Sequence, residues 1–310
     1  MEKVDVTKFK KIFLIYNRNS GKQIFASMMS RVNEVYKHLK SSYGSAQVEL
    51  IDVQRFDELE GIGQKICAKK ADWVIIAGGD GTVRKLIEII VDGGARPYFS
   101  IFPAGTVNLV AKELQIPLDP AKWVNRSAKG ILSQVYFARA NGHLFLTCAG
   151  IGYDSLIVNA VSESAKKLLN KFAYVLGGAQ MIRKEFLRRH WQYQFQVRSD
   201  GGEWQDASTV IVGKSRYYAG RYMIFPGAGL KNDCFHAALF TGSSSGDFVR
   251  YSALLGMEML SSDSTVKMIK GKKLEIKCNV DDFPAELDGD IITTAPLTLE
   301  MEESPLQFIG

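Results

Sequence analysis

The residues with the clearest chemical meaning lie in one short stretch, Gly78-Gly-Asp-Gly-Thr82, which directly follows the apolar run Trp73-Val-Ile-Ile-Ala77. Because glycine has no Cβ atom, these three glycines let the backbone approach a ligand closely and adopt positive φ values. A helical pattern begins at Val83, and the N-terminus of a helix presents unpaired N–H groups to an anion. The stretch therefore predicts a phosphate-binding turn between a strand and a helix.

Asp80 is the unusual member of this turn, since a carboxylate repels phosphate. It has a chemical role there only if it faces a metal ion, an arriving hydroxyl group or a ribose. The alternative is an ordinary glycine-rich turn between a strand and a helix.

Two further turns in the first half combine glycine with small polar residues: Asn17-Arg-Asn-Ser-Gly-Lys22 and Pro103-Ala-Gly-Thr-Val-Asn108. Each follows an apolar strand pattern and precedes a helical one. Strands that alternate with helices predict a parallel sheet covered on both faces, with ligands at the carboxyl ends of the strands. We therefore expect the three turns to converge, although Ser20 and Lys22 could equally be helix-capping and solvent-exposed residues.

Gly78-Gly-Asp-Gly-Thr82 resembles the signature of the diacylglycerol kinase catalytic-domain family, which includes bacterial lipid kinases and the sphingosine and ceramide kinases. More distantly, it is similar to NAD kinases and phosphofructokinases. The stretch from Pro103 to Ala111 resembles the P-x-G-T-x-N-x-x-A element of the first family. NAD kinases and phosphofructokinases lack this pairing, so the resemblance favours the lipid kinases.

The resemblance implies that the three turns contact a nucleotide. The implied nucleotide-binding residues are Asn17, Ser20, Gly21, Lys22, Gly78, Gly79, Asp80, Gly81, Thr82, Gly105, Thr106 and Asn108. Three positions depart from the family pattern. Arg18 replaces the usual Pro, Asp52 falls where kinase members often carry a Thr, and Leu109 stands where many members have an Asp. The adenosine contact near position 52 is thereby put in question.

From Gln134 onward the pattern changes to alternating apolar and polar residues with hairpin turns, including Asn141-Gly142, which favours a type I′ turn. This predicts a nucleotide-binding α/β domain over residues 1–130 and a β-rich lipid-substrate domain over 131–295. The resemblance implies a parallel-sheet first domain like that of NAD kinases and phosphofructokinases, a β-sandwich-like second domain, and a strand in 296–310 that returns to the first. A helix is expected over 172–187, where it could line an acyl-chain pocket or pack against the β-domain.

Two carboxylates in the second half have implied roles in the reaction. Ala149-Gly-Ile-Gly-Tyr-Asp154 resembles the family's G-x-G-x-D element, which implies that Asp154 lies at the lipid headgroup, although it could instead cap a helix starting at Ser155. Phe283-Pro-Ala-Glu-Leu-Asp-Gly-Asp290 resembles the Q/E-x-D-G-E element, whose last acid is the general base. Asp290 is one methylene shorter than Glu, and a plain hairpin turn is the alternative. Asp80 competes for the base role, but it lies in the phosphate loop, so Asp290 is favoured.

The stretch Tyr217 to Phe235 is similar to an element of the bacterial lipid kinases that holds a structural Mg²⁺. The resemblance implies that Asp233 and the backbone carbonyls of Leu230 and Phe235 are the metal ligands. Oxygen ligands suit such a hard ion. Cys234 replaces the usual Gly, so the ion site is distorted or lost if that position needs positive φ.

Composition places the chain with ordinary globular proteins, since 46% of its 310 residues are hydrophobic and 23% are charged. There is no apolar leader pattern and no uncharged run of spanning length, so we expect a cytoplasmic protein. The four cysteines are scattered, which indicates buried thiols rather than disulfides or a zinc site. The net charge of +6 comes partly from clusters that could attract an anionic surface. These are Lys166 and Lys167, Arg183 to His190, and Lys267 to Lys273.

Together these features predict an ATP-dependent, Mg²⁺-requiring lipid kinase, peripheral at the inner membrane surface, that phosphorylates a lipid hydroxyl. ATP and a membrane lipid are the expected partners, nucleic acid is not, and a homodimer is compatible with the sequence. The sequence does not distinguish diacylglycerol, a sphingoid base or phosphatidylglycerol as the substrate. A soluble-substrate kinase of the NAD kinase type and a nucleotide-binding regulator without catalysis are the alternative readings.

Overall fold

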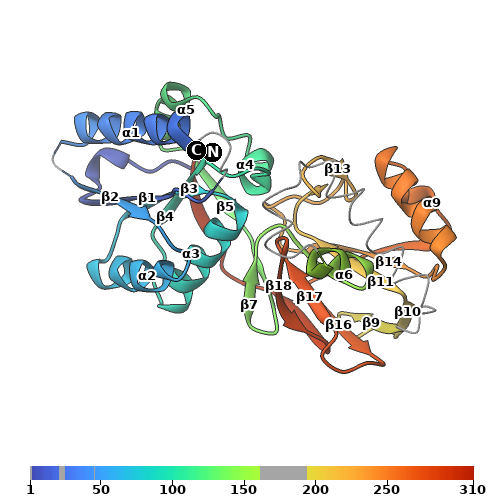
Figure 1. The fold of residues 1–310 in the computed structure, drawn as a ribbon. Coiled ribbons are helices and arrows are strands. Elements are labelled where there is room, and N and C mark those ends of the chain that lie inside the picture. Colours follow the sequence, from blue (N-terminus) through green and yellow to red (C-terminus); the bar gives the residue numbers. More distant parts are fainter. Residues whose placement is uncertain (1, 21–24, 45, 161–193) are drawn as a thin grey trace. The chain divides into compact units, whose positions relative to one another are not determined.

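The computed structural model describes residues 2–20, 25–44, 46–160 and 194–310 (Figure 1). They form two compact units, each of which is described by itself. The first comprises Met1–Phe137 and Glu303–Gly310, and the second comprises Ala138–Glu302. The first unit is therefore discontinuous in the sequence.

The first unit is built on a six-stranded sheet with the strand order β2-β1-β3-β4-β20-β5. Five strands are parallel, and the edge strand β5 runs antiparallel to β20. The strands are β1 (Lys11–Asn17), β2 (Gln47–Val53), β3 (Trp73–Gly78), β4 (Tyr98–Pro103), β5 (Leu132–Val135) and β20 (Leu306–Ile309). The helices are η1 (Val6–Lys8), α1 (Phe25–Ser42), α2 (Glu58–Lys69), α3 (Asp80–Asp92), α4 (Leu109–Glu113) and α5 (Pro120–Ser127). Helices α1 and α5 pack together on one face of the sheet and α2 and α3 on the other, which confirms the predicted α/β architecture (Figure 1).

A buried aromatic core holds this sheet together. The indole of Trp73 in β3 stacks on that of Trp123 in α5, with ring centroids 6.3 Å apart. Trp73 Nε1 donates to Ser100 Oγ of β4 at 2.9 Å, and this hydroxyl donates to the carbonyl of Ile309 in β20 at 2.6 Å. Apolar packing and buried hydrogen bonds thus connect strands β3, β4 and β20.

Helix α3 begins at Asp80, three positions before the predicted start at Val83. Gly79 is its N-cap, and the amide of Val83 already donates to the Gly79 carbonyl at 3.0 Å. The apolar period could not show this start, because the first turn is made of Asp80, Gly81 and Thr82. The predicted phosphate loop is therefore partly the first turn of the helix.

The second unit is a sandwich of two antiparallel six-stranded sheets, with the orders β10-β9-β16-β19-β6-β7 and β15-β14-β11-β8-β17-β18. The strands of the first sheet are β6 (Ala138–Ala140), β7 (His143–Phe145), β9 (Phe195–Ser199), β10 (Gln205–Ala207), β16 (Lys273–Cys278) and β19 (Leu297–Met301). Those of the second are β8 (Cys148–Ile151), β11 (Thr209–Gly213), β14 (Phe235–Phe240), β15 (Val266–Gly271), β17 (Pro284–Leu287) and β18 (Asp290–Thr294). A small ribbon, β12 (Tyr217–Tyr218) and β13 (Tyr222–Met223), and the helices α6 (Tyr153–Ala160), α9 (Ser245–Gly256) and η3 (Leu260–Ser262) complete the described part. One apolar core takes side chains from both sheets, as in the T-shaped pair Phe195 and Phe283.

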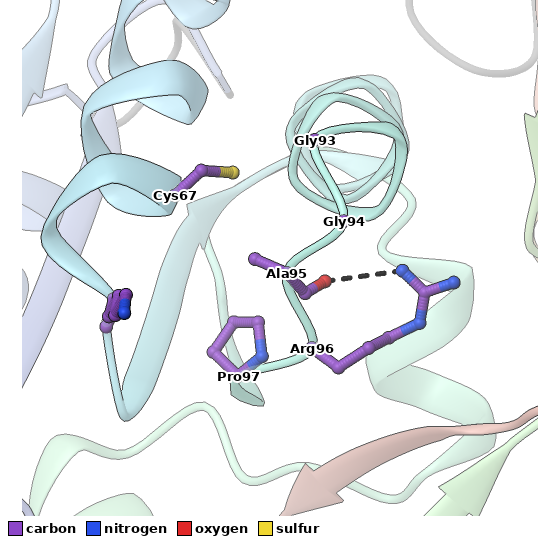
Figure 2. Close-up of a pocket in the computed structure, with 8 residues that line it drawn as sticks. Cys67, Gly93, Gly94, Ala95, Arg96 and Pro97 are labelled. Atoms are coloured by element: carbon purple, nitrogen blue, oxygen red, sulfur yellow. Dashed lines mark hydrogen bonds between the residues drawn. The ribbon is translucent and has the colours of Figure 1, made fainter.

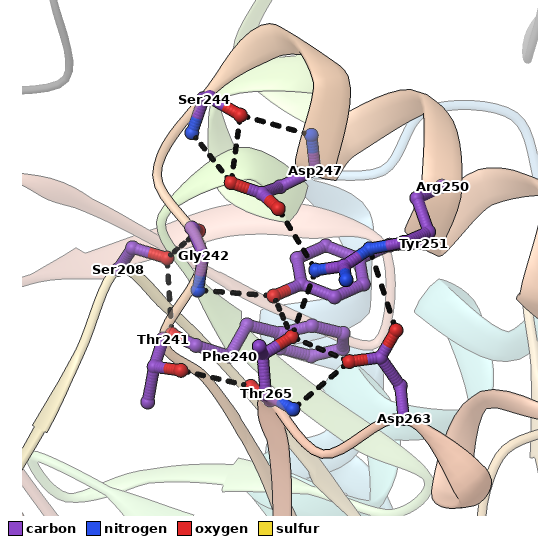
Figure 3. Close-up of polar contacts among 10 residues, drawn as sticks. All are labelled: Ser208, Phe240, Thr241, Gly242, Ser244, Asp247, Arg250, Tyr251, Asp263 and Thr265. Carbon is purple, nitrogen blue, oxygen red and sulfur yellow. Dashed lines mark hydrogen bonds and ion pairs between the residues drawn. The ribbon is translucent and has the colours of Figure 1, made fainter.

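Helix α9 is capped by its own residues at the start and is held by polar contacts in its middle (Figure 3). Ser244 and Asp247 form a capping box at its N-terminus. The hydroxyl of Tyr251 accepts from the Gly242 amide at 3.0 Å and lies 2.6 Å from Thr265 Oγ1. The helix therefore covers the outer face of this sheet in a fixed orientation.

Two predicted strands of the second half are divided differently in the structure. The expected strand from Val135 to Arg139 is split, because β5 belongs to the sheet of the first unit and β6 to the sandwich. The expected return over 296–310 is also split: β19 pairs with β16 and β6 in the sandwich, and only β20 joins the first unit. Alternation of apolar residues signals a strand but carries no information on its sheet.

Some expectations concern residues outside the described part. These are the helix over 172–187, the basic clusters at Lys166, Lys167 and Arg183 to His190, and the nucleotide residues Gly21 and Lys22. Of the cysteines, Cys148 is buried as expected, whereas Cys67, Cys234 and Cys278 are partly exposed, and all four thiols are free. No helix in the described ranges is long and apolar enough to cross a membrane.

Candidate functional site

Two glycine turns of the first unit touch one another at the carboxyl ends of β3 and β4. A Cβ atom added to Gly105 would overlap the Cα atom of Gly79, and it would lie 2.6 Å from Asn108 Oδ1. The Asn108 side chain closes its own turn, since its Oδ1 accepts from the Gly105 amide and its Nδ2 donates to the Gly105 carbonyl, both at 2.8 Å. These two turns lie together, as expected for loops at the carboxyl ends of neighbouring parallel strands. Only glycine at position 105 permits so close an approach.

The turn after β1 is joined to the same region by two side chains. Asn17, which is buried, donates from Nδ2 to Thr82 Oγ1 at 2.8 Å. Ser20 Oγ accepts from the Gly79 amide at 3.1 Å. Ser20 therefore links the turn after β1 to the turn after β3. Asn17, Ser20, Gly79 and Thr82 come together as the sequence predicts.

The first turn of α3 supplies the anion-binding part of this arrangement. Amides in the first turn of a helix have no intrahelical acceptor and carry a partial positive charge. Asp80 is the first residue of the helix, and its Oδ1 accepts from the Val110 amide of α4 at 3.3 Å. The carboxylate thereby connects the N-terminal ends of two helices. Gly78, Gly81 and Thr106 lie in the same turns.

The departures from the family pattern at positions 18 and 52 are partners of one another. Arg18 Nε donates to Asp52 Oδ1 at 3.0 Å, and its Nη2 pairs with the second carboxylate oxygen. The Asp52 carboxylate raises the pKa of Arg18 through this hydrogen bond. Such a bidentate pair is specific in geometry. Asp52 is therefore engaged by Arg18, at the place where an adenosine contact was put in question.

A pocket lies near the amino ends of strands β3 and β4, at the opposite end of these strands from the glycine turns. It is lined by the C-terminal end of α2 around Cys67 and by the turn Gly93 to Pro97 before β4 (Figure 2). These residues precede β3 and β4, whereas the glycine turns follow them. The pocket is therefore not part of the predicted nucleotide site.

In the second unit, Asp154 belongs to a buried acidic group and does not cap its helix. Its Oδ1 accepts from the hydroxyl of Tyr218, and its carboxyl lies beside that of Glu286. Both carboxyls pack over Gly150, where a Cβ atom would overlap Asp154 Oδ2 and lie 3.0 Å from Glu286 Oε1. Burial raises the pKa of both carboxyls, and the charge of Asp154 raises that of Glu286 further.

The hairpin between β17 and β18 carries the predicted general base. Asp288 and Gly289 have φ values of 50° and 88°, so Asp288-Gly-Asp290 is indeed a tight turn. Asp288 anchors it, since its carboxylate accepts from the amides of Leu146 and Thr147, both at 2.8 Å. Glu286 Oε2 accepts from the Gly289 amide at 2.7 Å. Asp290 thus begins a strand on a turn held from both sides.

The loop expected to hold a structural Mg²⁺ is already occupied by lysine side chains. Lys214 Nζ donates to the carbonyls of Asn232 and Cys234, the latter at 2.8 Å. The Asp233 carboxylate turns outward to Lys272 Nζ at 2.6 Å. No cluster of His, Cys, Asp and Glu suited to a metal ion occurs in the described ranges. Within the predicted ligand set of Leu230, Asp233 and Phe235, the one carboxylate is therefore engaged by Lys272, in a loop whose carbonyls at 232 and 234 accept from Lys214.

Sequence reasoning missed three residues of these groups: Lys214, Tyr218 and Glu286. Lys214 ends a buried strand, Thr209-Val-Ile-Val-Gly, where a lysine without a partner would be unfavourable. A lysine directly after a buried strand therefore indicates, from the sequence alone, that its ammonium has a partner inside the protein. Glu286 stood in the motif quoted for Asp290, but the spacing of the motif does not indicate which acids are buried together.

A parallel-sheet unit with glycine turns, followed by a β-sandwich that carries an anchored acidic hairpin, is the two-unit architecture on which the comparisons with known proteins bear. The chain matches the diacylglycerol kinase catalytic domain over residues 11–140 and the YegS C-terminal NAD kinase beta sandwich-like domain over 147–310. It therefore belongs to the diacylglycerol kinase catalytic-domain family of lipid kinases.

Two similar proteins and one similar solved structure are diacylglycerol kinases from bacteria. The chain is 23% identical over 282 residues to a diacylglycerol kinase of Staphylococcus carnosus (strain TM300), covering 91% of this chain and 89% of the relative. It is 22% identical over 284 residues to one of Bacillus subtilis (strain 168), covering 91% and 90%. The crystal structure of a diacylglycerol kinase from Bacillus anthracis str. Sterne superposes with a TM-score of 0.76 at 21% identity, covering 97% of both chains. This likeness shows the shared fold.

Proposed function

We propose that the protein transfers the γ-phosphate of ATP to the hydroxyl group of a membrane lipid, with Mg²⁺ accompanying the nucleotide. The observation that carries this proposal is the contact between the glycine turns at Gly79 and Gly105, which brings the turn after β4 against the N-terminus of α3, where first-turn amides favour an anion. In the proposal the nucleotide-binding residues are those named above, with Gly21 and Lys22 retained from the resemblance.

The two candidate acids take different roles in this proposal. Asp290 is the general base that accepts the proton of the lipid hydroxyl, because Asp288 and Glu286 hold its turn rigidly. Asp80 orients the Mg²⁺ of the nucleotide through water, since it lies at the N-terminus of α3. Asp154 lies at the lipid headgroup, where its pairing with Glu286 and Tyr218 positions it.

The proposal also includes a peripheral position on the inner surface of the membrane, where the lipid is reached from the cytoplasm. Exposed lysines at 267, 270, 272 and 273 would face anionic lipid. Two of them already have acidic partners, since Lys272 pairs with Asp233 and Lys273 with Glu300. Any attraction to the membrane would therefore depend mainly on Lys267 and Lys270 among these four.

The test is to incubate the protein with labelled ATP and a total lipid extract and to identify the labelled product. We expect a phosphorylated lipid. A labelled product that stays in the aqueous phase would instead indicate a soluble-substrate kinase of the NAD kinase type. No labelled product under conditions in which ATP binds would contradict the proposed transfer.

Two substitutions separate the acids once the lipid is known. Asp290→Asn should lower turnover by roughly 10²–10⁴-fold with little change in ATP affinity, because Asn keeps the shape but cannot take the proton. Asp80→Asn should impair Mg²⁺-ATP binding and turnover together. Asp281→Asn, an exposed acid before β17, is the matched control and should leave both unchanged. A fully active Asp290→Asn protein would remove Asp290 from the mechanism.

A further inference from the structure

A lysine ammonium lies inside the second unit, at the loop where related proteins are expected to hold a metal ion. Lys214 follows strand β11, and its side chain is completely buried. Its Nζ donates to the backbone carbonyls of Asn232 and Cys234. Burial lowers the pKa of Lys214 to about 8, so the ammonium form still prevails at neutral pH. The loop thus already contains one positive charge.

The Asp233 carboxylate of this loop pairs with a different lysine from the one that the loop carbonyls contact. Asp233 is exposed, and its carboxylate pairs with Lys272 on the surface at 2.6 Å. A Mg²⁺ ion requires near-octahedral oxygen ligands at about 2.0–2.1 Å. Here the carboxylate is turned outward, and the carbonyls at 232 and 234 point to an ammonium that would repel a divalent ion.

We propose that the Lys214 ammonium replaces a structural divalent cation in the loop before β14, so that the second unit is stable without bound metal. The chemistry is equivalent in one respect, since both cations satisfy backbone carbonyls that would otherwise be buried without a donor. The ammonium is a compact charge with three donors on a flexible stem, which lets it reach carbonyls two residues apart.

Cys234 agrees with this arrangement. The family's Gly at this position would matter if the backbone were left-handed there, but Cys234 is not among the residues with positive φ. The loop therefore has a backbone that a side chain tolerates, and its carbonyl at 234 accepts from Lys214 at 2.8 Å. The cysteine in the loop and the lysine after β11 therefore fit one arrangement, in which a side chain takes the place of a metal ion.

The first experiment measures the melting temperature of the nucleotide-free protein in EDTA and in excess Mg²⁺. An ion bound only to the folded state would raise the melting temperature by mass action. We expect no difference between the two conditions, and no stoichiometric Mg²⁺ in the dialysed protein by elemental analysis. A Mg²⁺-dependent rise that Asp233→Ala abolishes would overturn the proposal.

The second experiment replaces the ammonium and keeps the stem. Lys214→Met should lower the melting temperature by roughly 5–10 °C in EDTA, because the carbonyls of Asn232 and Cys234 lose their donor. Lys231→Met, an exposed lysine of the same loop, is the matched control and should change it by less than about 2 °C. A Lys214→Met protein as stable as the parent would show that only packing of the stem matters and would reject the proposal.

These measurements do not depend on kinase activity. If Lys214→Met does not fold, the response of the parent protein to EDTA and Mg²⁺ still decides between ammonium and metal. A protein that phosphorylates no lipid but melts identically in both conditions would contradict the proposed function and leave the role of Lys214 supported.

Discussion

Asp154 and Glu286 cannot both be ionised in their buried position. Neither Asp154 Oδ2 nor Glu286 Oε1 has a donor from the described residues, so the two carboxyls share one proton. Tyr218 donates to Asp154, which favours Asp154 as the anion and Glu286 as the acid. A family motif that allows Gln or Glu at this position agrees with that assignment, because a Gln amide donates a hydrogen bond as a protonated Glu does.

The shared proton predicts a pH-dependent stability. The folded-state pKa of Glu286 is raised well above 4.5 by burial and by Asp154, so the folded protein binds a proton that the unfolded chain has lost. Its contribution to stability is complete below about pH 4.5 and declines as the pH rises towards the folded-state pKa. Glu286→Gln should remove this decline, which can reach ~1.4 kcal/mol per pH unit. Urea unfolding at several pH values measures it.

The control for this experiment is Glu303→Gln, since Glu303 is exposed. It should retain the pH dependence of the parent protein. If Glu286→Gln and the parent have parallel stability profiles between pH 5 and 8, Glu286 does not hold the shared proton.

At the scale of elements, the contact between the turns after β3 and β4 is the most sensitive point of the first unit. Gly105→Ala places a methyl group against Gly79 and Asn108 Oδ1, so the turns must separate. Overpacking of this kind costs about 1–3 kcal/mol. If that cost falls on the nucleotide-binding geometry, ATP binding weakens by roughly 5–100-fold. Isothermal titration calorimetry with Mg²⁺-ATP measures the change.

Gly61→Ala is a suitable control for this substitution. Gly61 lies in helix α2, and a Cβ atom there meets no other atom within 4 Å. The alanine should leave ATP binding unchanged and add up to ~1 kcal/mol of stability through its helix propensity. Unchanged ATP binding by Gly105→Ala would mean that the two turns do not form the phosphate site.

Local sequence patterns predicted the strands and turns better than they predicted which residues contact one another. Asn141-Gly142 predicted a type I′ hairpin, and both residues have positive φ, at 48° and 84°. This turn could be predicted from the sequence because the two residues at the centre of a hairpin determine its turn type. The ion pair of Arg18 with Asp52 could not be predicted, although both residues were recognised as departures from the family pattern. It joins residues at the ends of two different strands. Burial of Glu286 beside Asp154 likewise depends on strand pairing across the sheet.

At the scale of the whole molecule, the discontinuity of the first unit was only partly predictable. The motif order indicated two domains and a returning segment, but the distribution of strands between three large sheets is set by long-range packing. Strand β20, red in Figure 1, lies inside the first sheet between β4 and β5. Its Phe308 is buried, with its ring centroid 5.7 Å from that of Phe99.

Phe308→Ala should therefore destabilise the first unit by about 3–5 kcal/mol, because it leaves a cavity between two central strands. Urea unfolding monitored by tryptophan fluorescence, to which the buried Trp73 and Trp123 of this unit contribute, follows the change. Ser304→Ala, an exposed neighbour, should have no effect beyond ~0.5 kcal/mol. Equal stability of Phe308→Ala and parent would show that β20 adds nothing to the first sheet.

The place of β20 in the chain order also has a consequence during synthesis. Residues 303–310 follow the entire sandwich unit, so the ribosome has made residues 138–302 before the strand between β4 and β5 exists. Domains usually fold as they emerge, N-terminal first. Here β4 would be paired only with β3, and β5 would have no partner strand, until β20 has been made. The first sheet would thus be completed only after the whole sandwich unit has been translated.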